Sequence, residues 1–393
     1  MENKNQNCLV RLKMKKQYFN ALQILRAITF LSIFLSHCLI VDGAFSRWGV
    51  AVFFVLSGFL NAVHGYDKEL DCSLKASFNY GIRKIKKLFP LHVVMVFVAF
   101  GLYVFSNISE LIAKFPTSAI VAVLKLLSNI FLVSDLFPSE GITNAIFSEY
   151  NIVTWYLSAM LVFYILTPLL LKGIKALFSD KRSTNITIRM ILFMLIIYAL
   201  VIIENLLFVK TLGSERAFWY VYENPLSRIG DYVIGLILGC LYAYKMNPSN
   251  SSGTAGNIKS KEIKAYALTT FSALISILLL YIGIVVFTDA QKWMISSGFY
   301  FTIPAAGLVI GLAFLESFIK EKVWDNVAIK KLIQFGTLSA YTYLIHVPVI
   351  NLVHAIYKRL AVVNVYIWGA ISMIITVVIA MEVYENSKSK KVK

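Results

Sequence analysis

Apolar runs of about twenty residues recur along this chain of 393 residues, and they constrain its fold more than any other feature. Twenty residues of α-helix rise about 30 Å, the thickness of the hydrocarbon core of a bilayer, where only helices and closed barrels satisfy their backbone polar groups. Hydrophobic residues make up 58% of the chain, so its length says little about a count of soluble domains. The sequence therefore predicts an all-α, polytopic membrane helix bundle.

Ten of these runs are predicted to cross the membrane. They lie at residues 21–41, 46–64, 89–106, 150–171, 188–209, 226–244, 265–288, 296–316, 337–357 and 362–384. One further apolar stretch, 118–137, would reverse the orientation of every later segment if it crossed, and would put the basic loop 172–189 outside. Without that crossing all the basic loops lie on one side. We therefore expect 118–137 to be an interfacial or re-entrant segment of the large outer segment 107–150.

The positive charges support this topology. In the ten-span scheme the inner segments hold 28 of the 38 Lys and Arg and the outer segments hold 8, which is the asymmetry that sets orientation. The net charge of +17 is therefore attributed to topology, and nucleic acid is not an expected partner. We expect a multi-pass protein of the plasma membrane with both termini cytoplasmic. Its parts would be a basic N-terminus (1–20), a membrane domain (21–385) and a basic tail (386–393).

Neither cleavage nor metal binding is predicted. The first apolar run follows a polar, basic segment and lacks a small-residue cleavage site, so we expect it to remain in the mature protein. Cys8, Cys72 and Cys240 fall on or near the inner side and Cys38 nears the outer face, so no pair shares an oxidising compartment. We expect no metal site. A Ser/Asn/Gly-rich loop, 247–256, separates six spans from four without defining a second domain.

Two residues of the first span need a functional explanation. Arg26 and His37 are eleven positions apart, about three helical turns and about 16 Å of rise, so they project from nearly the same face. A charged residue inside a span costs roughly 2.5–3.5 kcal/mol and is usually tolerated where it faces the bundle interior. The pair therefore predicts that one face of this helix carries chemistry.

Small and basic residues further along could contribute to the same site. Ser57 and Gly58 in the second span would let a backbone or a ligand approach closely. Arg83, Lys84 and Lys87 lie within about one turn of each other and suit an anionic group such as the phosphates of a nucleotide. Topology-setting and contact with lipid headgroups also explain such a cluster.

Four later residues are also candidates, and for three of them a purely structural role is an alternative. Trp155 is expected at the outer interface, where tryptophans are common. Arg228 and Asp231 lie three residues apart, so they could neutralise each other instead of binding a ligand. His346 lies in mid-span, as a hydrogen-bonded packing residue or as a functional group.

In their order and spacing these motifs resemble the acyltransferase 3 family of integral membrane O-acyltransferases. The set covers about residues 21–385 and consists of Arg26 with His37, then GVAVFFVLSGFL, RKIKKLFP, WYLSAMLVFYILTP, NPLSRIGDYVIGLILG and LSAYTYLIHVPV. Two places depart from the family pattern. Met160 stands where many relatives carry a glutamate, and the last span ends in VYENS without the usual proline, which leaves Glu385 without an assigned role.

The resemblance implies transfer of an acyl group, usually acetyl, from cytoplasmic acyl-CoA to a hydroxyl of an extracytoplasmic sugar. His37 would be the general base toward that hydroxyl or would itself be transiently acylated, and Arg26 would bind polar groups of the CoA arm or stabilise developing negative charge. The residues expected to bind the donor are Arg83, Lys84, Lys87 and Arg228, and those expected to line the cavity are Ser57, Trp155, Tyr164 and His346.

The partners implied are acyl-CoA as a donor substrate rather than a tightly bound cofactor, an extracytoplasmic glycan such as a surface polysaccharide, the lipid bilayer and envelope-assembly proteins. Since only nine residues, 385–393, follow the last span, we expect transfer to finish in the membrane domain or on a separate partner.

Two other classes of function remain open. A polysaccharide or proton-coupled transporter could also carry intramembrane Arg and His, although we find no inverted repeat and few intramembrane carboxylates, Glu204 and Asp231 being the clearest. A non-catalytic membrane subunit of an envelope assembly complex would tolerate the loss of both Arg26 and His37. Stabilisation by acetyl-CoA would favour the transferase.

Overall fold

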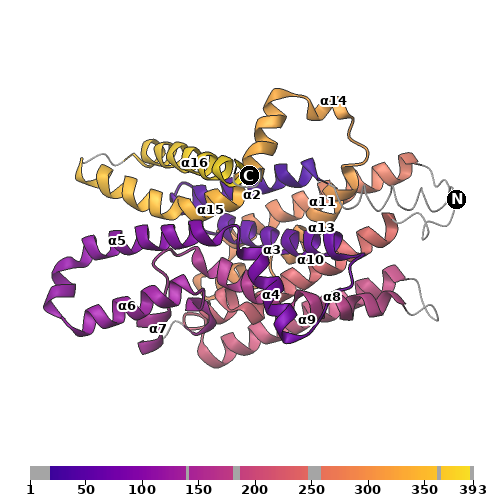
Figure 1. The fold of residues 1–393 in the computed structure, drawn as a ribbon. Coiled ribbons are helices and arrows are strands. Elements are labelled where there is room, and N and C mark those ends of the chain that lie inside the picture. Colours follow the sequence, from indigo (N-terminus) through magenta and orange to yellow (C-terminus); the bar gives the residue numbers. More distant parts are fainter. Residues whose placement is uncertain (1–17, 139–140, 180–185, 247–257, 361–363, 390–393) are drawn as a thin grey trace.

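The computed structural model describes residues 18–138, 141–179, 186–246, 258–360 and 364–389, and over these residues it contains helices and no strands (Figure 1). The all-α prediction is therefore confirmed for this part of the chain. The loop 247–256, most of the N-terminal segment 1–20 and the end of the basic tail lie outside the described residues.

Eight helical stretches of the described chain are long and apolar enough to cross a membrane. They are built on α3 (Ala44–Gly65), α5 (Phe89–Ala113), α8 (Thr154–Ser179), α9 (Ile186–Leu212), α10 (Pro225–Met246), α11 (Ile258–Tyr281), α15 (Val327–Arg359) and α16 (Val365–Ser389). The other two predicted spans correspond to α2 (Asn20–His37), which contains Arg26, and to the shorter apolar helix α13 (Thr302–Leu315). The chain therefore forms a multi-pass helix bundle.

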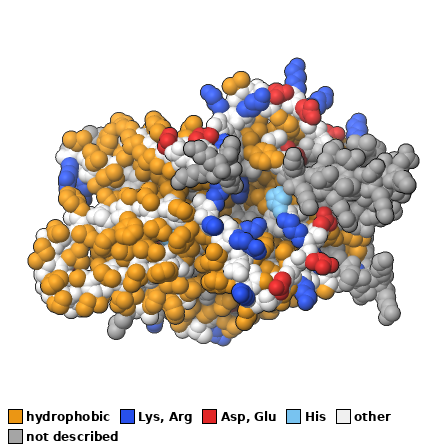
Figure 2. All heavy atoms as spheres, in the orientation of Figure 1, with side chains coloured by type: hydrophobic (Ala, Val, Ile, Leu, Met, Phe, Trp, Pro, Cys, Tyr) orange, Lys and Arg blue, Asp and Glu red, His pale blue; other side chains and the backbone are white. Residues whose placement is uncertain are grey.

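Short helices make up much of the rest: α4 (Leu74–Ile85), α6 (Thr117–Ile130), α7 (Gly141–Phe147), α12 (Trp293–Ser296) and α14 (Glu321–Trp324). Figure 2 shows a broad hydrophobic surface over the side formed by α5 and α6, and charged side chains gathered over the region of α4 and α14. This separation is typical of a protein that exposes one belt to lipid and its ends to water.

The apolar stretch 118–137 forms α6, whose fourteen residues rise only about 21 Å. It runs back along α5 (Figure 1), and His92 Nε2 in the first turn of α5 donates to the carbonyl of Asn129 at 3.0 Å. The side chain of Asn129 donates to the carbonyl of Ser148 and accepts from the amide of Tyr150. The end of α6 is therefore fastened to the segment that leads into α8.

Glycines bring α3 and α10 into backbone contact at the centre of the bundle. A Cβ atom at Gly58 would lie 2.1 Å from the carbonyl oxygen of Tyr232, and one at Gly235 would lie 2.1 Å from that of Val55. Gly239 meets the Phe59 carbonyl in the same way, so the contacts advance together along both helices. The two helices are therefore parallel, as small residues at a membrane helix interface allow.

The second close pair, α2 and α15, fixes the helix that carries Arg26 and His37. The carboxylate of Glu316 accepts from the first amides of α2, at 2.8 Å from Ala21 N and 3.1 Å from Asn20 N. A Cβ at Gly336 would lie 1.8 Å from the Gln23 carbonyl, and His346 further along α15 reaches His37 at the other end of α2. These two helices therefore also run parallel.

Replacing Gly58 with Ala is expected to lower the free energy of unfolding by about 1–3 kcal/mol, because α10 offers no space for the added methyl group. The matched control is Gly101→Ala, since nothing lies within 4 Å of a Cβ there. Melting temperatures in detergent measure both. Equal melting temperatures for the two variants would contradict the packing described.

Candidate functional site

A hydrogen bond between two imidazoles is the centre of the candidate site. His37 Nδ1 lies 2.7 Å from His346 Nε2, and the ring planes are 12° apart. His346 Nδ1 lies 2.8 Å from the carbonyl oxygen of Tyr343. Because a carbonyl can only accept, His346 Nδ1 carries a proton, and in the neutral ring Nε2 is then the acceptor. The proton in the His37–His346 bond therefore belongs to His37 Nδ1, and His37 Nε2 keeps its lone pair.

The two rings differ in their exposure. His346 is fully buried and packs edge-on against Phe30, with Phe34 and Tyr343 on its other sides. His37 is the last residue of α2 and is half-buried. No hydrogen bond to its Nε2 is found among the described residues. His346 thus orients His37, and Nε2 of His37 can accept a proton.

Arg26 lies in a separate cavity of about 100 Å³ between α2, α3, α4, α8 and α15. Ser57, Lys84 and Tyr164 line it with Arg26, so the structure brings together four residues that the sequence nominated. Arg26 Nε is buried without a hydrogen-bond partner, and within the described residues no carboxylate pairs with the guanidinium. An uncompensated guanidinium inside a membrane bundle favours an anionic or strongly polar ligand.

Although Arg26 and His37 project from nearly the same face of α2, the structure does not join them in one cavity. Neither histidine lines the Arg26 cavity. Tyr343 does line it, and its ring centroid is 5.7 Å from that of His346. The ring of Tyr156 packs against that of Tyr343 at 5.3 Å, so two aromatic side chains bound the cavity on the side where Tyr343 meets His346.

Of the four basic residues predicted to bind the donor, only Lys84, from the cluster 83–87, lines the cavity. Lys84 lines it, and partial withdrawal from water together with nearby Lys68 lowers the pKa of Lys84 to about 8. Arg83 is exposed and lines no described pocket. Lys87 lies over the rings of Tyr341 and Tyr384, 5.3 Å from each centroid. With this pKa Lys84 is still mostly charged at neutral pH, and a bound anion would favour that form, so Lys84 is the strongest of the three candidates in the cluster.

Arg228 does not reach the cavity, because Asp231 neutralises it. The two side chains form a buried ion pair at 2.8 Å, Arg228 Nη1 donates to the Ser297 carbonyl at 3.1 Å, and Thr302 donates to Asp231. The geometry therefore favours the mutual neutralisation that the spacing allowed and gives no support to donor binding by Arg228.

The placement of Trp155 in an aromatic belt is corrected by the structure. Its ring is buried, 4.9 Å from the Tyr222 ring and 6.0 Å from that of Phe54, and it does not line the Arg26 cavity. Tyr156, the next residue, lines the cavity instead and lies 3.4 Å from the Ser57 hydroxyl. Sequence reasoning missed Tyr156 and Tyr343, although each stands within three residues of a position it selected.

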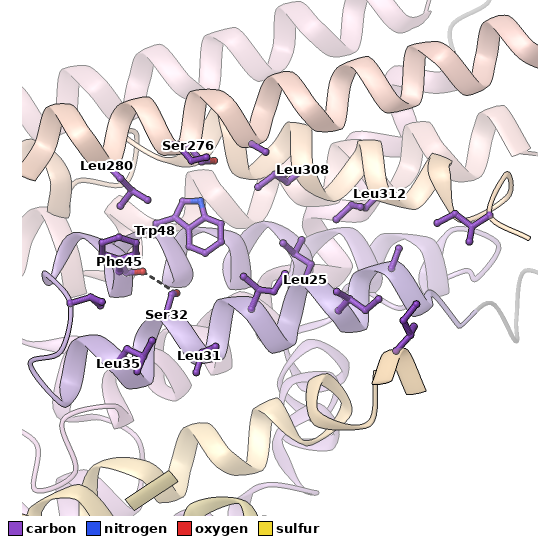
Figure 3. A pocket seen from close by; sticks show the side chains of 18 of the residues that line it. Leu25, Leu31, Ser32, Leu35, Phe45, Trp48, Ser276, Leu280, Leu308 and Leu312 are labelled. Carbon is purple, nitrogen blue, oxygen red and sulfur yellow. Dashed lines mark hydrogen bonds between the residues drawn. The ribbon is translucent and has the colours of Figure 1, made fainter. Parts of the chain in front are cut away.

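A larger groove of about 640 Å³ lies on the opposite face of α2 (Figure 3). Its walls are almost wholly apolar, and its few polar groups include Ser32, which donates to the Phe45 carbonyl at 3.2 Å. Side chains labelled in Figure 3 include Leu25, Leu31, Leu35, Trp48, Leu308 and Leu312. It offers no group for proton transfer. Within the described ranges no cluster of three or more His, Cys, Asp and Glu could hold a metal ion.

A family model described as an acyltransferase domain matches residues 19–383 of this multi-pass helix bundle, which defines its class. The chain belongs to the acyltransferase 3 family.

Curated relatives agree with this family. The "Putative O-acetyltransferase SACOL0978" of Staphylococcus aureus strain COL is 25% identical over 353 residues, which cover 87% of this chain and 52% of that protein. The O-acetyltransferase OatA of Staphylococcus aureus strain NCTC 8325 is 25% identical over 376 residues, which cover 93% of this chain and 55% of OatA. The chain thus spans about half the length of these relatives. No solved structure matches it.

Arg228→Met alone is expected to lower the free energy of unfolding by about 3–5 kcal/mol, because it leaves Asp231 buried without its cation. The double variant Arg228→Met with Asp231→Leu should recover most of that loss. Melting temperatures of both variants and the parent test this. A double variant that melts below the single one would show that the pair does more than neutralise itself.

Proposed function

We propose that this chain is a membrane O-acetyltransferase that moves an acyl group, acetyl by default, from cytoplasmic acyl-CoA to a hydroxyl of an extracytoplasmic sugar, with a cell-surface polysaccharide as the first candidate acceptor. The observation that carries the proposal is the His37–His346 hydrogen bond, which leaves one imidazole nitrogen free to accept a proton at the end of α2. Membership of the acyltransferase 3 family and the O-acetyltransferase names of the relatives support it.

In this mechanism His37 Nε2 takes the proton of the acceptor hydroxyl as its oxygen attacks the thioester carbonyl. The C–O bond forms, the C–S bond breaks, and the proton passes from His37 to the departing CoA thiolate. A sugar hydroxyl is too weakly acidic to attack unaided, and a positioned base contributes about 10² to 10⁴ in rate. His346 Nε2 accepts a hydrogen bond from His37 Nδ1–H throughout and so stabilises the imidazolium that forms on His37.

Arg26 is proposed to hold the donor by its polar groups on the cytoplasmic side of His37. Its buried guanidinium has no carboxylate partner among the described residues, which supports a ligand role. Since Tyr343 separates the Arg26 cavity from the histidines, the thioester reaches His37 only when the Tyr343 ring moves aside. Binding of the donor would thus join the Arg26 cavity to His37 in one continuous site.

The helix directions support ten spans, which put both termini on the same side of the membrane, and the basic loops favour the cytoplasm for that side. α3 and α10 are parallel, which requires an odd number of crossings between them, and α5, α8 and α9 supply three while α6 adds none. α2 and α15 are parallel as well, which requires α13 to cross despite its length. We propose on this basis a plasma-membrane protein whose donor enters from the cytoplasm and whose acceptor enters from outside. Envelope-assembly proteins are the proposed further partners.

His37→Ala is expected to lower acetyl transfer by about 10² to 10⁴, because the base is lost, while acetyl-CoA still raises the melting temperature. Radiolabelled transfer by the purified protein and thermal unfolding with acetyl-CoA measure the two effects. A folded His37→Ala protein that transfers at the parental rate would falsify the assignment of the base. A parent stabilised by an ion gradient or a sugar but not by acetyl-CoA would favour a transporter.

His346 is proposed as a positioning residue, and two variants separate this role from packing. His346→Gln keeps an acceptor oxygen for His37 Nδ1–H, whereas His346→Leu keeps only volume. Turnover should fall much further in the Leu variant than in the Gln variant, with an unchanged KM for acetyl-CoA. If both variants lose turnover equally, orientation of His37 by His346 is wrong.

A further inference from the structure

A second, basic pocket lies close to the ends of α3 and α8 that the proposed topology places in the cytoplasm. It has a volume of about 230 Å³, and three of its seven lining residues are lysines, Lys68, Lys172 and Lys175. Glu69 is its one acidic lining residue, so the lining carries a net charge of about +2. A pocket of this charge suits an anion.

The three lysines have different roles. Lys175 Nζ donates to the carbonyls of Gly65 and Lys68, at 3.1 and 2.9 Å, and therefore fixes the chain that leaves α3. Lys68 and Lys172 are exposed, and neither forms an ion pair or side-chain hydrogen bond within the described part of the chain. Their ammonium groups can therefore turn toward a ligand held in the pocket.

One stripe of α8 joins this pocket to the Arg26 cavity. Tyr156, Met160 and Tyr164 line the cavity, and Pro168 and Lys172 continue the same four-residue step into the pocket. Tyr164 and Lys172 are eight residues apart, about 12 Å along the helix. Lys84 at the cavity is also close enough to Lys68 for the two charges to interact.

Polar side chains lie between the Arg26 cavity and the basic pocket. The Tyr80 hydroxyl donates to Asn61 Oδ1 at 3.3 Å, and Tyr164 also hydrogen-bonds Asn61. Asn61 Nδ2 donates to the Ser57 carbonyl at 3.0 Å, one turn nearer to the cavity. This seam of Asn61, Tyr80 and Tyr164 supplies donors and acceptors to an arm that carries amide groups, as the pantetheine of CoA does.

We propose that the pocket of Lys68 and Lys172 binds the phosphorylated nucleotide end of the acyl-CoA donor, while the pantetheine arm follows the Asn61 seam to Arg26. The proposal rests on the proposed function and names residues for it that the basic cluster 83–87 does not contain. Lysine ammonium groups bind phosphate as compact point charges, and an exposed charge pair contributes about 0.2–1 kcal/mol, so two such pairs amount to about tenfold in affinity.

The test compares the double variant Lys68→Gln/Lys172→Gln with a matched control, Lys259→Gln/Lys261→Gln, which removes two exposed charges from α11. Binding of acetyl-CoA, of S-acetylpantetheine and of adenosine 3′,5′-bisphosphate is measured on the full chain in neutral-lipid nanodiscs. We expect the double variant to lose about tenfold in affinity for acetyl-CoA and for the bisphosphate, and to bind S-acetylpantetheine as the parent does. The control should match the parent with all three.

Equal affinity of the parent and the double variant for acetyl-CoA would overturn the nucleotide site while leaving the proposed function intact. An equal loss for S-acetylpantetheine would also overturn it, because that probe lacks phosphates of the nucleotide. Stabilisation of the parent by anionic lipid, lost in the double variant with acetyl-CoA affinity unchanged, would identify a lipid headgroup site instead. A parent that binds none of the probes would refute the proposed function together with this inference.

Discussion

The seating of α2 is the constraint on which the rest of the site depends. Glu316 holds its first amides, the Gly336 backbone meets it at Gln23, and the imidazole of His346 meets its last residue. Each of these contacts comes from a part of the chain about 300 residues away, so segments distant in sequence hold the helix at both ends. With both ends fixed, Arg26 and His37 occupy set depths, and the chemistry on one face of the helix has defined surroundings.

The free-energy cost of burying a charge is met in different ways at the two arginines inside the bundle. Arg228 has a carboxylate three residues away, a carbonyl acceptor and an aromatic ring 5.2 Å from its guanidinium carbon, so its charge is satisfied within the protein. Arg26 has aromatic hydroxyls nearby and a cavity in front of it, and no carboxylate pairs with it in the described structure. Burial of a charge without its counterion is sustained where a ligand completes the arrangement.

Much of the bundle could be predicted from the sequence. The length of each apolar run indicates a helix that contacts lipid, and the basic loops indicate segments that contact water. The same local reasoning found Arg26 and His37, whose shared face follows from helical geometry alone. It could not find that His346 pairs with His37, that Tyr343 packs between the Arg26 cavity and His346, or that Lys172 shares a pocket with Lys68. These facts depend on which distant helices touch, and Trp155 was misplaced for the same reason, since its neighbours Phe54 and Tyr222 come from other segments.

The contact between the rings of Tyr156 and Tyr343 also has a consequence for the membrane. A chain of water from the Arg26 cavity to His37 would conduct protons through imidazoles and drain the ion gradient that the membrane maintains. With Tyr156 and Tyr343 packed against each other, the Arg26 cavity reaches neither histidine. Ring packing of this kind keeps a membrane-spanning bundle electrically tight.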